Sequence, residues 1–275
     1  MAAPLGIIAG GGELPFAIAE SARDAGRGVF VVALSADKWV GAYPHERISL
    51  GEIGKLLKAL HTAGCEEVVM AGKLARPKFR DVKLDAKALL VAPRIIAAAR
   101  KGDDAILRAV SEAFEREGFR IVGAHEAAPG LLAQAGVMGR IKPSSDAEED
   151  IALAFKIVRA MGAFDIGQAA VVCEGLALAI EAAEGTDAMI ARVATLPEHF
   201  CGTVEKRRGV LVKAPKLIQD RRTDLPVIGV QTVRNAAAVG LAGIAVEAGG
   251  ALILGKNAVI AEADKLGLFL AGVAG

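Results

Sequence analysis

The first half of the chain alternates short apolar runs with helical segments, and this alternation limits the fold more than any other feature. Four runs have the length of buried strands: Leu5–Ala9, Gly28–Leu34, Glu67–Ala71 and Phe119–Gly123. Three segments are predicted to be helices: Leu14–Ala25, Glu52–Ala63 and Asp103–Glu117. Strands and helices that alternate in this way are typical of parallel sheets. The pattern predicts an N-terminal Rossmann-like parallel α/β domain, in which the basic stretch after Pro77 is a mobile connection.

The composition changes after a connection that contains glycine and proline, at residues 135–143. Ser144 or Ser145 is predicted to cap a helix over Asp146–Met161, whose first turn is acidic, as the helix dipole prefers. Two strand pairs that turn at glycine are predicted to be hairpins: Gln168–Cys173 with Leu176–Ala182, and Ile244–Glu247 with Ala251–Leu254. We therefore expect an α/β protein of two domains, with a nucleotide-binding-like domain at 1–138 and a mixed α/β domain with hairpins at 139–275.

Composition limits the partners and the compartment. The 275 residues carry 33 basic and 32 acidic side chains, so no bulk field attracts nucleic acid. Three cysteines lie far apart without a C-x-x-C pair, which fits a reducing compartment and argues against disulfides or a zinc site. No signal peptide is expected at Met1–Leu5, and the most apolar stretch, Ala236–Leu254, is interrupted by Glu247 and several glycines. We expect a soluble, cytoplasmic protein.

A charged loop lies between two apolar runs in the C-terminal half, at Lys213–Gly229. Its charged residues are Lys213, Lys216, Asp220, Arg221, Arg222 and Asp224. Prolines at 215 and 226 argue against one continuous helix or central strand. Carboxylates offer oxygen ligands to Mg²⁺, and cations neutralise phosphate oxygens, so such a loop can form a site for a metal and an anion. The alternative is a solvated charged turn.

Three consecutive glycines follow the first predicted strand. Glycines between a strand and a helix let backbone N–H groups approach a phosphate at the helix N-terminus. The dinucleotide fingerprint G-x-G-x-x-G would need glycine where Pro15 stands, and only Asp37 is available as the ribose-binding acid. A nicotinamide dehydrogenase is therefore not supported. A nucleotide or phosphate contact through Gly10, Gly11 and Gly12 stays open, beside a tight turn that merely needs glycine.

Two further turns carry charge. Gly72-Lys73 is not a P-loop, because the motif's other positions are not filled, so Lys73 either contacts a phosphate or is an exposed loop charge. The segment Glu181–Asp187 holds three carboxylates. A helix cap explains Thr186 and Asp187 but leaves Glu181 and Glu184 unexplained. Together with the acids of the charged loop, these carboxylates could hold a Mg²⁺ and position a water.

Four segments together resemble one family. They are I-I-A-G-G-G-E-L-P (Ile7–Pro15), I-E-A-A-E-G-T-D-A-M (Ile180–Met189), V-K-A-P-K-L-I-Q-D-R-R-T-D-L-P-V-I-G (Val212–Gly229) and G-L-A-G-I-A-V-E-A-G (Gly240–Gly249). From the first strand to the last, the chain resembles the LpxI family of UDP-2,3-diacylglucosamine pyrophosphatases of lipid A biosynthesis. The resemblance implies a two-domain cytoplasmic hydrolase that cleaves UDP-2,3-diacylglucosamine to UMP and 2,3-diacylglucosamine 1-phosphate (lipid X).

The resemblance also implies a cofactor, a location and an essential residue. Family members need a divalent metal, usually Mg²⁺, and work at the inner-membrane surface as peripheral proteins. Attack on the β-phosphorus and a homodimer are further expectations. The family motif Q-D-x-R-x-D-x-P reads Q-D-R-R-T-D-L-P here, which places the essential aspartate on Asp224 with Asp220 as its neighbour.

We predict that Asp224 is a metal ligand or the base for water, and that Asp220 assists it. Glu184 and Asp187 are predicted as further metal ligands. The predicted substrate contacts are Gly10, Gly11, Gly12, Lys73, Thr186, Lys213, Lys216, Arg221 and Arg222. The C-terminal domain would then be catalytic and lipid-binding. The alternative is a non-catalytic nucleotide- or lipid-binding module, which would tolerate the loss of Asp224.

Overall fold

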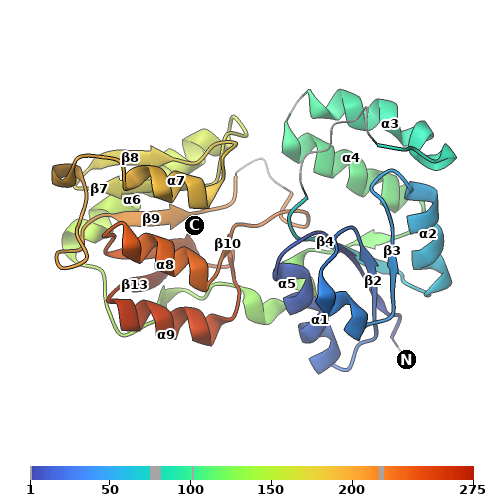
Figure 1. The fold of residues 1–275 in the computed structure, drawn as a ribbon, viewed down its shortest axis with the longest axis horizontal. Coiled ribbons are helices and arrows are strands. Elements are labelled where there is room, and N and C mark those ends of the chain that lie inside the picture. Colours follow the sequence, from blue (N-terminus) through green and yellow to red (C-terminus); the bar gives the residue numbers. More distant parts are fainter. Residues whose placement is uncertain (1, 75–81, 101, 217–219) are drawn as a thin grey trace. The chain divides into compact units, whose positions relative to one another are not determined.

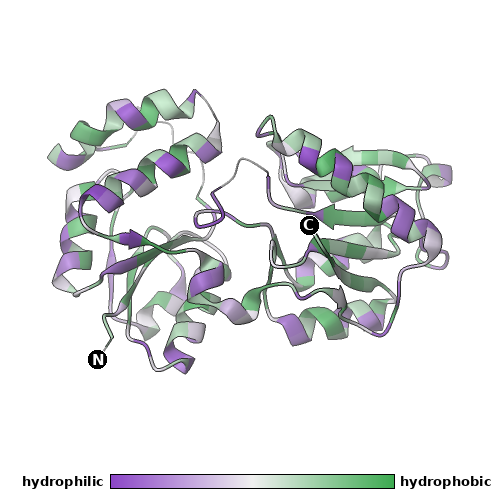
Figure 2. Cartoon of the chain, turned by 180° about the vertical axis from the view of Figure 1, so that it is seen from behind, coloured by the Kyte–Doolittle hydropathy of each residue, from purple (hydrophilic) through white to green (hydrophobic). Residues whose placement is uncertain are grey.

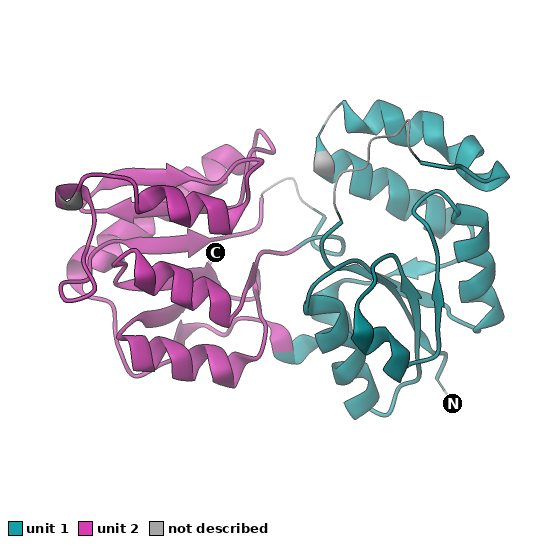
Figure 3. Ribbon diagram, in the orientation of Figure 1, with its two compact units in different colours: residues 1–130, 220–224 teal, residues 131–219, 225–275 magenta. Residues whose placement is uncertain are grey.

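The computed structural model describes residues 2–74, 82–100, 102–216 and 220–275 (Figure 1). The contacts between residues divide the chain into two units (Figure 3): unit 1 is residues 1–130 and 220–224, and unit 2 is residues 131–219 and 225–275. The sequence analysis placed the division at 138. Residues 131–138 contact unit 2, because strand β6 (Gly136–Val137) pairs there with β13 (Phe269–Val273).

Unit 1 is built on a parallel sheet. Its strands are β1 (Leu5–Ala9), β2 (Val29–Ala33), β3 (His45–Arg47), β4 (Glu67–Ala71) and β5 (Arg120–Ile121). Their order is β3-β2-β1-β4-β5, so the direction in which strands are added reverses between β1 and β4. This is the doubly wound arrangement, and it confirms the predicted Rossmann-like parallel domain.

Helices cover both faces of this sheet (Figure 1). They are α1 (Leu14–Asp24), α2 (Ile53–Thr62), α3 (Ala86–Ala99), α4 (Asp103–Arg116) and α5 (Ala124–Ala127), with 3-10 turns at Lys38–Ala42 and Pro129–Leu131. Even-numbered strand residues such as Ile8 and Val32 pack with Leu57 of α2 and Phe114 of α4. Helix α1 contacts the same strands and also α5. Alternation along each strand thus supplies two apolar faces, as a buried parallel sheet requires.

Helix α3 corrects one expectation, since the sequence analysis predicted a mobile connection in this part of the chain. Asp85 caps the helix by accepting a hydrogen bond from the N–H of Ala88 at 2.8 Å, and its other oxygen accepts one from the N–H of Gly54 at 2.7 Å. The sequence A-K-A-L-L-V-A that follows is rich in strong helix formers. A cap followed by helix formers therefore outweighs the basic character of the stretch.

The main sheet of unit 2 is mixed. Its strands are β6, β7 (Ala169–Cys173), β8 (Leu176–Ile180), β9 (Val210–Lys213), β11 (Gly243–Glu247) and β13, in the order β6-β13-β11-β9-β7-β8. A separate parallel pair joins β10 (Val227–Ile228) to β12 (Leu252–Ile253). Strands β9, β11 and β13 are parallel, whereas β6, β7 and β8 pair in the antiparallel sense. The predicted mixed α/β class is confirmed.

Two helical layers enclose this sheet. The helices are α6 (Ser145–Gly162), α7 (Thr186–Val193), α8 (Val230–Ala238) and α9 (Lys256–Leu266), with a 3-10 turn at Glu198–Phe200. Val210 and Val212 of β9 pack with α6, while Leu211 between them packs with α7, α8 and α9. Among the described residues, no helix has the length and apolar character needed to cross a membrane.

One of the two predicted hairpins exists. Strands β7 and β8 turn at Glu174 and Gly175, both with positive φ, and the buried carboxylate of Asp150 accepts hydrogen bonds from both their N–H groups. The second prediction is wrong, because β12 pairs with β10 instead of β11. Strand β11 has parallel neighbours on both sides, so it has no free edge for an antiparallel partner.

Candidate functional site

The carboxyl ends of β1 and β4 meet at the switch point of unit 1, where doubly wound sheets bind their ligands. The glycine turn follows β1, and Gly72-Lys73 follows β4. The N–H of Gly10 donates to the carbonyl of Ala71 at 2.8 Å, and Gly11 and Lys73 exchange backbone hydrogen bonds of 2.9 and 2.8 Å. The two turns are therefore joined to each other through their backbones.

This junction explains two of the glycines. A Cβ on Gly10 would lie 2.8 Å from the carbonyl oxygen of Lys73, and one on Gly72, at φ 94°, would lie 2.8 Å from the carbonyl carbon of Gly10. The N–H groups of Gly10 and Gly11 already have acceptors in the protein. Gly12, at φ 100°, has open space around its Cβ position and precedes α1. A phosphate contact is therefore best placed at Gly12 and the N-terminus of α1.

Asp37 lies beside the glycine turn, after β2. Its Oδ2 accepts a hydrogen bond from the hydroxyl of Ser35 at 2.8 Å, and Ser35 also donates to the carbonyl of Gly10 at 3.3 Å. The Cβ position of Gly11 is 4.0 Å from the same Asp37 oxygen. An acid at this place in a doubly wound sheet can bind ribose hydroxyls. The fingerprint fails in the sequence, but the fold still brings an acid to the glycine turn.

The charged segment 220–224 folds as a compact turn in unit 1. Oδ1 of Asp220 accepts a hydrogen bond from the N–H of Arg222 at 3.0 Å. The Arg222 guanidinium donates to both carboxylate oxygens of Asp220 at 2.7 to 3.2 Å. Thr223 donates its N–H and its hydroxyl to the Asp220 carbonyl, each at 2.9 Å. The Arg222 hydrogen bonds hold the pKa of the Asp220 carboxyl below its usual range. The turn therefore contains a fixed, ionised carboxylate, and Asp224 closes it.

Helix α4 anchors this turn, and Gly123, the second residue after β5, lies against it. Asp104 is buried and accepts from the N–H of Asp220 at 3.2 Å, and Glu115 accepts from Arg222 at 2.8 Å. A Cβ on Gly123 would clash with the ring of His125 and lie 3.1 Å from the Cα of Arg222, so a side chain here would crowd both. The neighbouring His125 has a buried Nδ1 with no hydrogen-bond partner among the described residues. Sequence reasoning missed all of these anchors, which are distant in the chain.

Unit 2 contains a series of hydrogen-bonded polar side chains, with two buried charges, at the end of β9. Nζ of Lys213 donates to the hydroxyl of Thr186 at 2.9 Å and to the carbonyl of Val227 at 3.1 Å. The Thr186 hydroxyl in turn donates to Oε1 of Glu181 at 2.5 Å, whose Oε2 accepts from the N–H of Gln168 at 3.0 Å. Lys213 and Glu181 are only 5% and 6% exposed. The hydroxyl thus links a buried cation to a buried anion.

The other predicted residues of unit 2 each have a different partner. Lys216 pairs with Asp165, a residue that the sequence analysis did not single out. Glu184 pairs with Arg192 at 3.0 Å, and Asp187 accepts from the amide of Asn235 at 2.9 Å. These contacts stabilise the surroundings of α7. They do not gather the two acids around one point within unit 2.

The donor chemistry fits Mg²⁺ only in part. Over the described residues, no group of three or more His, Cys, Asp or Glu side chains is close enough to hold a metal. Of the four predicted ligands, Asp220 and Asp224 belong to unit 1 and Glu184 and Asp187 to unit 2. Mg²⁺ is commonly held by one or two carboxylates together with substrate phosphates, rather than by a cage of protein ligands. The pair in the 220–224 turn satisfies that description.

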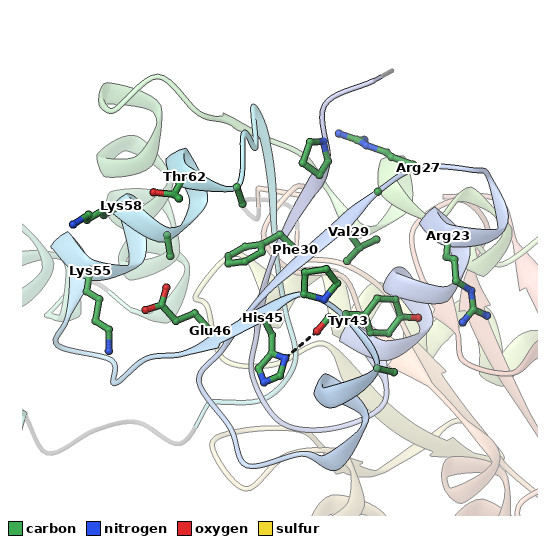
Figure 4. Close-up of a pocket in the computed structure, with 16 residues that line it drawn as sticks. Arg23, Arg27, Val29, Phe30, Tyr43, His45, Glu46, Lys55, Lys58 and Thr62 are labelled. Carbon is green, nitrogen blue, oxygen red and sulfur yellow. Dashed lines mark hydrogen bonds between the residues drawn. The ribbon is translucent and has the colours of Figure 1, made fainter.

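A large open cavity lies elsewhere, at the amino-terminal edge of the unit 1 sheet (Figure 4). Its volume is about 1030 Å³, and its walls come from α1, the starts of β2 and β3, and α2. Figure 4 shows Arg23, Lys55 and Lys58 around it. None of the predicted site residues lines it. Because ligands of doubly wound sheets bind at the opposite edge, this cavity is not the candidate active site.

The fold and these sites define a two-unit α/β protein whose N-terminal unit has the architecture of nucleotide-binding proteins. The LpxI N-terminal domain matches residues 4–131, and the LpxI C-terminal domain matches residues 134–271. A curated relative from Caulobacter vibrioides, the UDP-2,3-diacylglucosamine pyrophosphatase LpxI, is 51% identical over 271 residues, which cover 98% of this chain and 97% of the relative. The chain belongs to the LpxI family, as the four motifs predicted.

Proposed function

We propose that this protein hydrolyses the pyrophosphate bond of UDP-2,3-diacylglucosamine, with Mg²⁺, to UMP and 2,3-diacylglucosamine 1-phosphate. Membership of the family makes the chain an enzyme, a hydrolase of a phosphoric anhydride. The proposed substrate rests on one observation: the chain is 51% identical, over nearly the whole of both chains, to a relative named as a UDP-2,3-diacylglucosamine pyrophosphatase. The turn at 220–224 supports the chemistry, since it holds the Asp220 carboxylate against the Arg222 guanidinium and carries Asp224 and Arg221 beside them.

The reaction exchanges one P–O bond for another. The oxygen of water bonds to the β-phosphorus, the bond from that phosphorus to the bridging oxygen breaks, and the bridging oxygen leaves with UMP. The water's proton passes to a base. Charge accumulates on the phosphate oxygens and the leaving oxygen, so catalysis depends on positioning and on nearby positive charge. Bound Mg²⁺ would supply part of that charge.

We assign the reactive role in the turn to Asp224, as a Mg²⁺ ligand or as the base for water. Asp220 is tied to Arg222 through both oxygens, so we assign it the positioning of the turn. Arg221, Lys73 and the N-terminus of α1 after Gly12 are the proposed phosphate contacts of unit 1. Asp37 is the proposed ribose contact, because it lies where doubly wound proteins bind ribose hydroxyls.

In unit 2, Thr186 and Lys213 are joined to Glu181, and we propose that they hold the N-terminus of α7 against β9. Lys216, Glu184 and Asp187 remain predicted substrate or metal contacts. Their present partners, Asp165, Arg192 and Asn235, would have to exchange for phosphate or metal. A peripheral position at the inner membrane and a homodimer belong to the same proposal.

Release of UMP from UDP-2,3-diacylglucosamine in detergent micelles tests the proposal, with Mg²⁺ and with a chelator. We expect turnover that needs the metal and falls about a hundredfold or more in Asp224→Ala, while Asp146→Ala, an exposed aspartate of α6, retains wild-type turnover. In ¹⁸O-water, attack on the β-phosphorus places the label in the lipid product, whereas label in UMP would contradict it. If the wild type binds the substrate without cleaving it, the protein is a binding module and the hydrolase proposal fails.

A further inference from the structure

Helix α3 is apolar on both of its sides. Its inner residues Val91 and Ile95 line a small cavity with residues of α2 and α4, and Lys87 pairs with Glu117 at 2.6 Å. Its outer residues Leu89, Leu90 and Ile96 are 59%, 75% and 46% exposed. In Figure 2, α3 is mostly green for this reason. A helix that is hydrophobic all round is normally buried, but here one side is exposed on unit 1.

The helix is firmly held, so the exposed face is not a result of fraying. Asp85 caps its first turn and also binds the start of α2. Leu84, which is 40% exposed, directly precedes this cap and adds one more exposed apolar residue at the start of the helix. Contiguous exposed apolar side chains on a fixed helix mark a surface that contacts another apolar phase or partner. We call Leu84, Leu89, Leu90 and Ile96 the outer face of α3.

The charges around the outer face identify the partner. Lys83, Arg94 and Arg100 flank it, and none of them forms an ion pair with the described part of the chain. The one acid between residues 82 and 100 is Asp85, which is occupied as the cap. Apolar side chains bordered by cations fit an anionic lipid surface. A second copy of the chain fits less well, because a twofold contact would bring the cations of both copies together.

The length of α3 fits a position in the lipid interface. At 1.5 Å per residue its 14 residues extend about 21 Å, less than the roughly 30 Å of a bilayer core. We propose that the outer face of α3 is the surface by which this protein docks on anionic phospholipid bilayers. The inference rests on the proposed function in one respect, since an acylated substrate resides in such a bilayer.

Co-sedimentation of the full chain with vesicles tests this, without substrate. We expect binding to vesicles that contain phosphatidylglycerol and much weaker binding to phosphatidylcholine alone. Leu89→Glu with Leu90→Glu should lower the partition coefficient by about tenfold or more, because two leucines no longer enter the interface. Arg94→Gln with Arg100→Gln should lower it by about tenfold and reduce its salt dependence.

Matched variants in unit 2 serve as controls. Val204→Glu replaces an apolar residue that is 58% exposed, and Lys142→Gln with Lys156→Gln removes two exposed cations. Both should bind like the wild type. The inference is overturned if the wild type does not prefer anionic vesicles, if the leucine variant binds normally, or if that variant instead changes the sedimentation coefficient of the free protein. Far-UV circular dichroism shows whether each variant is folded.

The micelle assay separates this inference from the proposed function. If the leucine variant loses vesicle binding and still releases UMP from substrate in micelles, both proposals stand. If the wild type releases UMP but does not bind vesicles, the docking surface alone is refuted. If the wild type binds vesicles through α3 but never releases UMP, the hydrolase proposal alone is refuted.

Discussion

The segments Asp220–Asp224 and Glu181–Asp187 are both acid-rich turns in the sequence, yet their charges are used differently. In the first, Asp220 is bound by Arg222, two residues away, and Arg222 is 41% exposed. In the second, Glu181 is linked through Thr186 to Lys213, 32 positions away in the chain, and both ends are buried. The charge of Asp220 is thus compensated within its own turn, although distant residues of α4 anchor that turn, and the pair is partly exposed. The second turn depends on the whole unit being folded.

The sharpest test of this contrast removes one cation from each turn. Lys213→Met leaves Glu181 buried without its compensating charge, and we expect the free energy of unfolding of unit 2 to fall by about 3 kcal/mol. Arg222→Met removes a partly exposed pair, so unit 1 should lose less than about 1 kcal/mol. Hydrogen exchange of the amides of β9 and of β4 reports the two units separately. If both variants lost the same unfolding free energy, the buried Glu181 would not depend on the charge of Lys213 more than the partly exposed Asp220 depends on that of Arg222.

A finer comparison replaces one hydroxyl in each turn. Thr186→Val removes the group that joins Lys213 to Glu181, which should cost unit 2 about 1–3 kcal/mol because two buried polar groups lose a partner. Thr223→Val removes a hydrogen bond to the Asp220 carbonyl, which retains the N–H of Thr223 as a donor. That variant should lose less than about 1 kcal/mol. Urea unfolding monitored by hydrogen exchange of the amides gives the unfolding free energy of each unit. A larger loss for Thr223→Val than for Thr186→Val would reverse the comparison.

The smallest expected effect concerns pH. Because Arg222 lowers the pKa of Asp220 in the folded protein, the carboxylate adds stability above the unfolded pKa of about 3.9, and this contribution is lost as pH falls through the lower folded pKa. Asp220→Asn should therefore be less stable than the wild type at neutral pH, by under about 1 kcal/mol. The difference should shrink below about pH 4. A difference that is independent of pH would mean that the Arg222 pair contributes nothing.

Local patterns were sufficient for most of the fold. Alternation of strand and helix predicted the parallel sheet, and Glu174-Gly175 predicted the hairpin. The prediction failed at Leu252–Ile253, because the partner of a strand depends on which edges of the sheet are still free. It also failed at Ala86–Ala99, because the basic character of the stretch was given more weight than the Asp85 cap and the helix formers that follow it.

The residue types of the charged loop made it a candidate site, and that assignment stays a prediction. The geometry of the turn could not be predicted. Asp220, Arg222 and Asp224 lie in one turn, as their closeness in sequence suggests. The sequence could not show that Asp104 and Glu115 of α4 anchor this turn, since those contacts span more than 100 positions. Lys213 was predicted as a phosphate contact from its neighbours in sequence. Its burial depends on Thr186 and Val227, which only the folded sheet brings to it.

The assignment of residues 220–224 to unit 1 means that the protein is not a linear fusion of two independent modules. The family domains divide the chain once, between residues 131 and 134. The chain, however, passes from one folded unit to the other three times, after residues 130, 219 and 224. Any N-terminal fragment that ends near residue 131 therefore lacks its own charged turn. The complementary fragment carries that turn without the helix that anchors it. Neither half of the gene therefore encodes a complete folded unit.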